Sequence, residues 1–255
     1  MVGGDAPARP AWSRGGGGRV AAQGQPTGGV PLLELKNIGK DYRVGGGVVR
    51  ALEGVTFTVA EGEFLSIVGP SGSGKSTLMN ILGLLDRPGA GRYRLAGRPM
   101  EGMGPRALAA ERNERIGFVF QGFFLLPRLR LVDNVAAPLL YRGLPPALRR
   151  RRALEALAVV GIEDLALRRP TEVSGGQQQR AAIARALVTR PRLILADEPT
   201  GNLDTRTSHE IMDAFSALNA QGLTVVQVTH EPDIARYAGR IVTMRDGRVE
   251  SIAPA

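Results

Sequence analysis

The sequence predicts an α/β fold built around a parallel sheet, because short apolar strands alternate with helical patterns along the chain. Residues 64–68 form an apolar run that ends at a glycine-rich turn and precedes a helical pattern over residues 77–85. Apolar runs at residues 193–196 and 224–229 also alternate with helical patterns. Such alternation builds crossover units, which place neighbouring strands parallel in one sheet.

The helices within this alternation are expected at residues 177–189 and 208–219. Earlier in the chain, residues 32–35 and 48–59 have the composition of strands and are joined by three consecutive glycines, 45–47. Two strands joined by a short glycine-containing turn pair antiparallel. We therefore expect an N-terminal antiparallel β-subdomain before the parallel core.

Two further segments complete the expected fold. Residues 241–244 and 249–252, joined through Asp246-Gly247, are expected to form a closing hairpin. The helical patterns and arginines of residues 122–176, broken at Pro145-Pro146, predict a helical subdomain inserted into the α/β core.

Residues 1–30 are expected to form a disordered tail ahead of a domain over residues 31–255. This segment is rich in Gly, Ala, Pro and Arg and has no apolar periodicity. It cannot bury enough surface to offset the entropy of ordering it. Trp12, the only tryptophan, lies in this predicted tail.

The composition limits the classes of protein that fit. With 43% hydrophobic and 22% charged residues among 255, the chain is globular in character. No apolar run approaches the roughly 20 residues of a membrane span. The absence of cysteine excludes disulfides and thiolate–metal sites, and with no apolar signal segment it favours the cytoplasm. The net charge of +9 comes mostly from scattered arginines, so we expect no nucleic-acid partner.

The clearest motif is a phosphate-binding loop at residues 69–76, whose sequence GPSGSGKS fits G-x-x-x-x-G-K-[ST]. Its glycines let backbone N–H groups point at phosphates, and the following helix adds its positive N-terminal end. Lys75 is expected to reach the β- and γ-phosphates of ATP, and the Ser76 hydroxyl to bind Mg²⁺. The alternative is a Gly/Ser-rich turn with an incidental lysine. The strand expected before the motif and the helix expected after it favour the phosphate-binding loop.

Two carboxylates, Asp197 and Glu198, follow the apolar run at residues 193–196. Ligands of open α/β sheets bind outside the carboxyl ends of the strands. We expect Asp197 to hold Mg²⁺ through water and Glu198 to orient the attacking water. Taken alone, the pair could also be a helix cap and a solvated loop residue.

A second anion-binding turn is predicted where Ser174-Gly175-Gly176-Gln177 opens a helix. One chain does not need two γ-phosphate sites for one ATP, whereas two chains arranged head to tail do. We therefore expect a homodimer in which each copy presents this turn to the ATP on its partner's phosphate loop. In isolation the same turn would simply be a capped helix start.

From residue 32 to residue 252 the chain resembles the ATP-binding subunits of ABC transporters. The motifs behind this resemblance each occur once and in the family's order, with Val173 in place of the family's usual Leu: Tyr42, residues 69–76, Gln121, Asp197-Glu198, residues 173–177, residues 201–204 and Thr229-His230. The resemblance implies that Tyr42 stacks on adenine and that Gln121 contacts Mg²⁺ or water. It also implies that Asp204 reaches across the dimer and that His230 acts as a switch.

The predicted site can be stated residue by residue. The catalytic residues are Lys75, Gln121, Glu198 and His230, and the Mg²⁺ ligands are Ser76, Gln121 and Asp197. The residues that bind ATP are Tyr42, Gly69, Pro70, Ser71, Gly72, Ser73, Gly74, Lys75, Ser76, Thr77, Ser174, Gly175, Gly176, Gln177 and Asp204.

Several of these assignments have plainer alternatives. Gln121 could be a polar loop residue, Tyr42 a half-exposed packing ring, and His230 a satisfied structural histidine. His209 is expected to be such a structural histidine. The run of four arginines at residues 149–152 is expected to be a solvated helix face, with contact to anionic lipid headgroups as the other interpretation.

Residues 71–80, 83–88, 116–121 and 196–204 most resemble one branch of the family, the ATPases of lipoprotein-release, macrolide-export and cell-division systems. This implies ATP-driven export or extraction of a lipoprotein, peptide or macrolide-like substrate through a separate membrane permease. The chain would lie peripherally on the cytoplasmic face of the membrane. Regulation of cell-wall enzymes through a membrane partner, without transport, remains the alternative.

Residues 123–127, Phe-Phe-Leu-Leu-Pro, are expected to line a groove that receives a short helix of the membrane subunit. Two soluble alternatives fit less well. Family members that act on ribosomes resemble two motif sets in one chain, and this chain has one. Chromosome and repair ATPases need a long coiled coil between Lys75 and Ser174, for which the sequence leaves no room.

Overall fold

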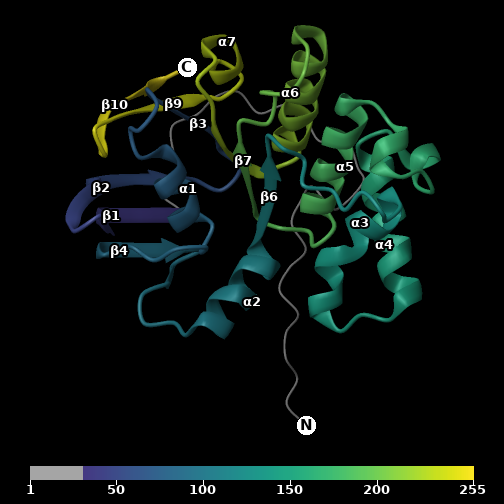
Figure 1. Cartoon of the computed structure of the whole chain (residues 1–255), viewed down its shortest axis with the longest axis horizontal. Helices are drawn as coiled ribbons and strands as arrows, with labels where there is room; N and C mark the ends of the chain where they lie inside the picture. The colour runs from purple at the N-terminus through teal and green to yellow at the C-terminus, as the bar shows by residue number, and fades with distance from the viewer. Residues whose placement is uncertain (1–30) are drawn as a thin grey trace.

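A computed structural model of the chain describes residues 31–255, which form two β-sheets with helices packed around them (Figure 1). One sheet has six strands in the order β10-β9-β3-β8-β7-β6, and the other has four in the order β2-β1-β4-β5. The predicted disordered tail at residues 1–30, with Trp12, lies outside the described residues.

The six-stranded sheet confirms the predicted parallel core and the closing hairpin. Its neighbouring strands all run parallel except β9 and β10, which pair antiparallel. Leu193 and Leu195 of β7 face one apolar core, and Ile194 and Ala196 face the other, so the sheet is buried on both faces. The strands are β3 (Phe64–Val68), β6 (Ile116–Phe120), β7 (Leu193–Asp197), β8 (Thr224–Val228), β9 (Arg240–Arg245) and β10 (Arg248–Pro254).

The four-stranded sheet confirms the predicted antiparallel N-terminal part. β1 (Leu33–Val44) pairs antiparallel with β2 (Gly47–Val59) and with β4 (Ala90–Leu95), and the short β5 (Arg98–Pro99) adds to β4. The sequence did not predict β4, because Tyr93 and Leu95 are its only large apolar residues. Both are buried, and pairing with β1 supplies the rest of the stabilisation.

Helix α1 (Lys75–Leu82) is packed between the two sheets and begins two residues before the expected start. Leu78, Ile81 and Leu82 are buried in one core with residues of both sheets. Full burial of a side chain of this size contributes roughly 1.5–3 kcal/mol. The helix that follows the phosphate loop is therefore held firmly along its length.

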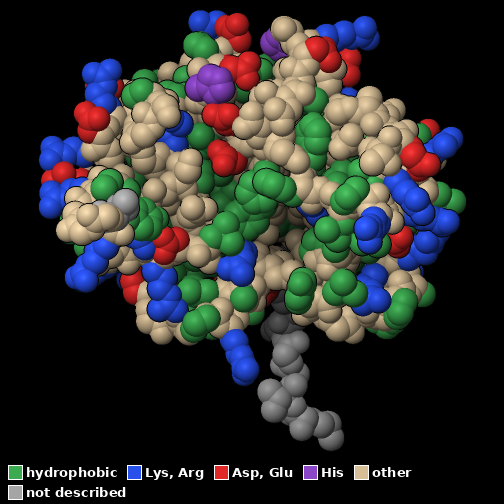
Figure 2. Space-filling view, in the orientation of Figure 1, with side chains coloured by type: hydrophobic (Ala, Val, Ile, Leu, Met, Phe, Trp, Pro, Cys, Tyr) green, Lys and Arg blue, Asp and Glu red, His purple; other side chains and the backbone are tan. Residues whose placement is uncertain are grey.

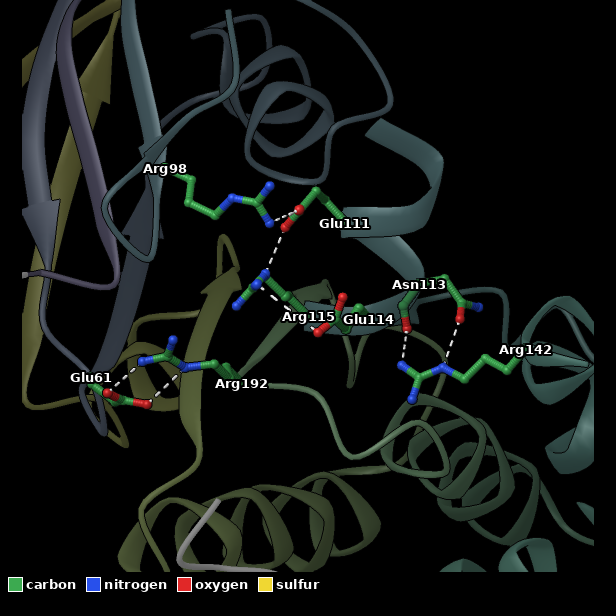
Figure 3. Close-up of polar contacts among 8 residues, drawn as sticks. All are labelled: Glu61, Arg98, Glu111, Asn113, Glu114, Arg115, Arg142 and Arg192. Atoms are coloured by element: carbon green, nitrogen blue, oxygen red, sulfur yellow. Dashed lines mark hydrogen bonds and ion pairs between the residues drawn. The ribbon is translucent and has the colours of Figure 1, made fainter. Parts of the chain in front are cut away.

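Helix α2 (Pro105–Arg115) was not predicted from the sequence. Only Leu108 and Glu111 of this helix are buried, so its apolar periodicity is too weak to detect. In the structure Arg115 and Arg98 of β5 both pair with Glu111, and Arg142 donates to Asn113 (Figure 3). Polar contacts with neighbouring elements take the place of an apolar stripe.

The segment between β6 and α5 (Gly175–Leu187) is mostly helical, as expected. It contains α3 (Leu131–Ala136), η2 (Ala137–Arg142), α4 (Pro146–Val159), η3 (Glu163–Leu165) and η4 (Pro170–Glu172). Its buried leucines share one core with α5. That residues 122–176 behave as a separate subdomain stays a prediction.

After β7 come α6 (Thr205–Ala220) and, beyond β8, the short α7 (Pro232–Ala235). Helix α6 starts three residues before the expected position, because the Asp204 side chain caps it and adds nearly one turn. Between residues 31 and 255, no helix is long and apolar enough to span a membrane.

Candidate functional site

The sheet brings most of the predicted site residues to one edge. Val228, near the end of β8, lies opposite both Ile67 of β3 and Asp197 of β7, and Asp197 lies opposite Phe120 of β6. The phosphate loop, Glu198, Gln121 and the turn with His230 each begin just after one of these strands. Parallel strands end at the same edge, so four predicted motifs converge there.

The phosphate loop has the geometry of an anion-binding turn. The Lys75 ammonium donates to the carbonyl oxygens of Gly69 and Pro70, both at 2.8 Å, and so lies across the mouth of the loop. Lys75 is also the first residue of α1, whose first backbone N–H groups have no acceptor within the helix. These donors, the helix dipole and the ammonium together form a strongly positive site.

Two glycines of this loop are required by close packing and by backbone conformation. Gly69 has φ +154°, and an added Cβ would lie 2.2 Å from the carbonyl oxygen of Met244 in β9. Gly74 has φ +96°, and its Cβ would lie 2.6 Å from the carbonyl oxygen of Ala51 in β2. The loop is therefore held between the two sheets.

Asp197 and Glu198 have different environments. Burial, and then the negative charge of Glu198, raises the pKa of Asp197, while the positive charge of Lys75 opposes the rise. No donor among residues 31–255 forms a hydrogen bond with the Asp197 carboxylate. The carboxylate is thus a partly buried negative charge beside the phosphate loop.

Glu198 adopts a backbone conformation with φ +45° directly after the strand, and its N–H donates to the Val228 carbonyl at 2.9 Å. Glu198 Oε1 lies 2.9 Å from Nδ1 of His230, which follows β8. A non-glycine residue in the left-handed region is uncommon, and such residues cluster at functional sites. The sheet therefore brings together Glu198, predicted to orient the attacking water, and His230, predicted to act as a switch.

Gln121 and the loop at residues 201–204 contact each other. The Asn202 amide donates to the backbone oxygen of Gln121 at 2.9 Å, and the Gln121 amide approaches Oδ1 of Asn202 at 3.5 Å. No role for Asn202 is predicted from the sequence, because side-chain to backbone contacts across so many residues leave no local pattern. Asp204 accepts from the Thr207 N–H and hydroxyl, at 2.9 and 2.6 Å, and these bonds lower its pKa.

The Ser174 turn lies beside the loop at residues 201–204, because a Cβ added at Gly175 would come within 3.5 Å of Leu203. Ser174 is the N-cap of α5: its hydroxyl accepts from the Gln177 N–H at 3.3 Å, while its own N–H donates to the Gln177 side chain at 2.9 Å. Ser174 is exposed, and in the described part of the chain no hydrogen bond joins residues 174–177 to the phosphate loop. The structure thus shows a capped helix start at Ser174, and its role in binding an anion stays a prediction.

Tyr42 and His209 lie on β1 and α6, outside the strands of the six-stranded sheet. Tyr42 on β1 is half-buried, and its hydroxyl donates to Asp86, which the sequence analysis did not identify. His209 lies outside the site, with Nδ1 2.8 Å from the Tyr237 hydroxyl, which fits the structural role expected for it.

A phosphate loop between strand and helix, with two carboxylates at the end of a neighbouring parallel strand, defines the class of P-loop nucleotide-binding ATPases. Comparison with known proteins identifies the family: the sequence model of the ABC transporter family matches residues 52–201. The chain belongs to this family and is an ATP-binding, ATP-hydrolysing protein of ABC transporters.

Its relatives include proteins of similar length and longer ones. It is 52% identical to the ABC transporter ATP-binding protein YknY of Bacillus subtilis, over 86% of this chain and 95% of that protein. It is also 52% identical to the macrolide export ATP-binding/permease protein MacB of Chlorobaculum tepidum, over 86% of this chain but only 33% of that protein.

The solved structures include a close match to the fold. The ATP-binding cassette MJ0796, in a dimeric post-hydrolysis state bound to ADP and Pi, superposes with a TM-score of 0.80 at 43% identity. The match covers 88% of this chain and 98% of that one. This confirms the expected ABC ATPase fold.

Proposed function

We propose that two copies of this chain bind and hydrolyse ATP at sites shared between them, and that they power a separate membrane permease. The single observation behind this proposal is the division of the anion-binding groups. The phosphate loop, Asp197 and Glu198 lie at one sheet edge, whereas the Ser174 turn is exposed and, within residues 31–255, makes no hydrogen bond to the phosphate loop. A second copy would supply each site with the missing half.

The residues on the first half of the site fit Mg²⁺. Ser76 offers a hydroxyl, Gln121 an amide oxygen and Asp197 a carboxylate, and all are oxygen ligands, as this ion requires. Burial, and then the negative charge of Glu198, raises the pKa of Asp197, and a bound cation would oppose both effects. Residues 31–255 contain no group of three or more His, Cys, Asp or Glu side chains suited to a metal. Mg²⁺ usually needs only one or two carboxylates together with the phosphates of its nucleotide.

Glu198 is proposed to orient and polarise the attacking water, and His230 to hold Glu198. Nδ1 of His230 lies 2.9 Å from Oε1 of Glu198, so His230 contacts the carboxylate directly. Lys75 would leave the two backbone carbonyls that it now contacts and bind the β- and γ-phosphates. Bound Mg²⁺ would supply neutralisation of the developing phosphate charge. Positioning and charge stabilisation account for most catalysis of phosphoryl transfer.

The second half of the site is proposed to come from the partner copy. Dimeric structures are known for the similar cassette MJ0796. Ser174, Gly175, Gly176 and Gln177 would contact the γ-phosphate bound by the partner. Asp204 would face the same interface. It is exposed, and its lowered pKa keeps it charged.

Nucleotide would then act as a two-state switch. ATP favours the closed dimer because its γ-phosphate contacts both copies, and hydrolysis removes that preference. A ligand shifts such an equilibrium only by the difference in its affinity for the two states. The permease would convert closing and opening of the dimer into movement of its own helices.

A groove beside Gln121 is the proposed permease contact. It has a volume of about 1160 Å³ and lies between α2, β6, η2 and α5. Figure 2 shows hydrophobic side chains and basic side chains (Lys or Arg) around a hollow in this part of the molecule. Phe124 lines the groove with 67% of its surface exposed, and its ring packs edge-on against Phe120 at 5.4 Å.

The sequence predicts that residues 123–127 line a groove for a short helix of the membrane subunit. Only Phe124 of the five lines the groove, and Leu125 packs against the core instead. Backbone oxygens of Phe123 and Phe124 accept hydrogen bonds from Arg185 of α5, which hold the segment in place. In the similar MacB proteins, ATP-binding and permease parts are combined in one protein. A short amphipathic helix of a separate permease suits an apolar groove of this kind.

The proposed cellular location follows from the permease as partner. The chain would lie peripherally on the cytoplasmic face of the membrane, attached through the permease. Similarity to macrolide-export proteins favours export or extraction of a macrolide-like, peptide or lipoprotein substrate.

Replacing Glu198 by Gln tests this function. The change keeps the size of the side chain but removes its charge, so turnover should fall roughly 10²–10⁴-fold while ATP still binds. Light scattering should then detect an ATP-dependent dimer, because hydrolysis no longer opens it. Glu163→Gln, on an exposed residue of η3, is the control and should behave as wild type. Normal turnover of the Glu198 variant, with no dimer in ATP, would contradict the proposal.

A further inference from the structure

Asp86, just beyond α1, joins two residues of β1 through its two carboxylate oxygens. The Lys40 ammonium donates to Oδ1 at 2.7 Å, and the Tyr42 hydroxyl donates to Oδ2 at 2.7 Å. Lys40 also donates to the Arg87 carbonyl at 2.8 Å, and its ammonium lies 5.1 Å from the centre of the Tyr42 ring. One carboxylate therefore restrains the Tyr42 ring at its hydroxyl end and holds a cation over one of its faces.

Asp86 is itself fixed to the C-terminal end of α1. The N–H groups of Leu85 and Asp86 both donate to the Asn80 carbonyl, at 2.8 and 3.1 Å, and the Arg87 N–H donates to Oδ1 of Asp86 at 2.7 Å. Helix α1 begins at Lys75 and is buried between the sheets along one side. A continuous rigid connection thus runs from the phosphate loop through α1 to Asp86 and on to Tyr42.

The charges favour strong hydrogen bonds in this cluster. Burial alone would raise the pKa of Asp86, but hydrogen bonds from Lys40, Tyr42 and the Arg87 N–H outweigh it and hold the pKa below its ordinary value. Burial, and then the bond to Asp86, raises the pKa of Tyr42. At neutral pH the acceptor is therefore ionised and the phenol keeps its proton, which makes the contact charge-assisted.

We propose that Asp86 is a positioning residue for recognition of the nucleotide base, holding Tyr42, with Lys40, at a set place relative to the phosphate loop. The inference rests on the proposed stacking of adenine on Tyr42. Helix α1 joins the phosphate loop to Asp86, so the distance between the loop and the Tyr42 ring is fixed. The phosphates of one ATP can then bind the loop while its base stacks on Tyr42. When the ring is free to take other rotamers, apparent affinity falls with the fraction of chains in which it is correctly placed.

The test is Asp86→Asn, which keeps one acceptor oxygen but turns an NH₂ donor toward Lys40 or Tyr42. Competition against a fluorescent nucleotide measures the affinities for ATP and for inorganic triphosphate, which has no base. We expect ATP to bind roughly three- to tenfold more weakly, while triphosphate affinity and kcat at saturating ATP are unchanged. Asp41→Asn is the matched control, because Asp41 lies on the same strand and pairs with Arg50 on the exposed side.

A second comparison separates this role from a general effect on folding. In a Tyr42→Ala background, Asp86→Asn should weaken ATP binding no further, because there is no ring left to position. Wild-type ATP affinity in the Asp86 variant, or an equal loss of triphosphate affinity, would overturn the inference. A wild-type chain that binds ATP and triphosphate equally well would overturn it together with the adenine role of Tyr42. A wild-type chain that binds neither would instead refute the proposed function.

Discussion

Replacing Gly74 by alanine tests how closely the phosphate loop is packed against the antiparallel sheet. Gly74 has φ +96°, and a Cβ there would lie 2.6 Å from the Ala51 carbonyl oxygen and 2.9 Å from Cδ2 of Leu52. Gly72, in the same loop, has φ +78° and nothing within 4 Å of its added Cβ. The two positions share a left-handed backbone and differ in free space, so they form a matched pair.

The expected magnitudes follow from that difference. A left-handed conformation costs a non-glycine residue roughly 1–2 kcal/mol, and this applies to both variants. Overpacking a well-packed site costs about 1–3 kcal/mol more, and this applies only at Gly74. The free energy of unfolding should therefore fall by about 2–5 kcal/mol in Gly74→Ala and by about 1–2 kcal/mol in Gly72→Ala.

Urea unfolding without nucleotide is the suitable assay, because it measures the fold apart from any change in ATP affinity. Both variants should keep the wild-type m value and differ only in the midpoint. Equal losses of stability in the two variants would refute the argument, because crowding by Ala51 and Leu52 would then contribute nothing.

Three further predictions concern the site, the groove and the partner. The pKa of Asp197 is raised in the folded state, so the native state binds a proton more tightly than the unfolded chain does. Protonated Asp197 therefore stabilises the fold at low pH, and this stabilisation is lost as pH rises through the raised pKa. Asp197→Asn should therefore gain stability over wild type in urea unfolding as pH increases from about 4, and a constant difference would contradict this. Arg142 donates to Asn113 Oδ1 at 2.9 Å and to its carbonyl at 2.7 Å, so Arg142→Ala should lose about 1–3 kcal/mol. Arg150→Ala, on an exposed residue of α4, is the control and should change stability by less than about 0.5 kcal/mol in the same assay. If Arg142→Ala lost no more stability than this control, the contacts with Asn113 would be dispensable. Phe124→Asp should keep ATP affinity but lose co-purification with the permease, and normal co-purification would remove Phe124 from the interface.

The location of the predicted phosphate-binding groups could be read from the sequence because each group depends on its neighbours in the chain. The motif at residues 69–76 joins strand β3 directly to the start of helix α1, and Asp197 and Glu198 lie at the end of an apolar strand. Local spacing alone determines where such residues lie on their elements. Convergence then follows, because parallel strands end at one edge of the sheet.

Other parts of the site depended on contacts that the sequence does not display. Asn202 meets Gln121 across 81 positions, and Asp86 meets Tyr42 across 44. Helix α2 has no apolar stripe because it is held by ion pairs and by Arg142 (Figure 3). Polar contacts of this kind leave no periodicity in the chain.

The sequence by itself determined the parallel core, the strand–loop–helix unit of the phosphate loop, the position of the two carboxylates and the capped helix start at Ser174. Each of these depends on residues close together in the chain and on the periods of strands and helices. Only the tertiary structure decided which side chains restrain Tyr42, what holds Gln121 and which aromatic residue faces the groove. Those answers depend on how separate elements pack, because a side chain's partners are set by the surface that folding brings against it.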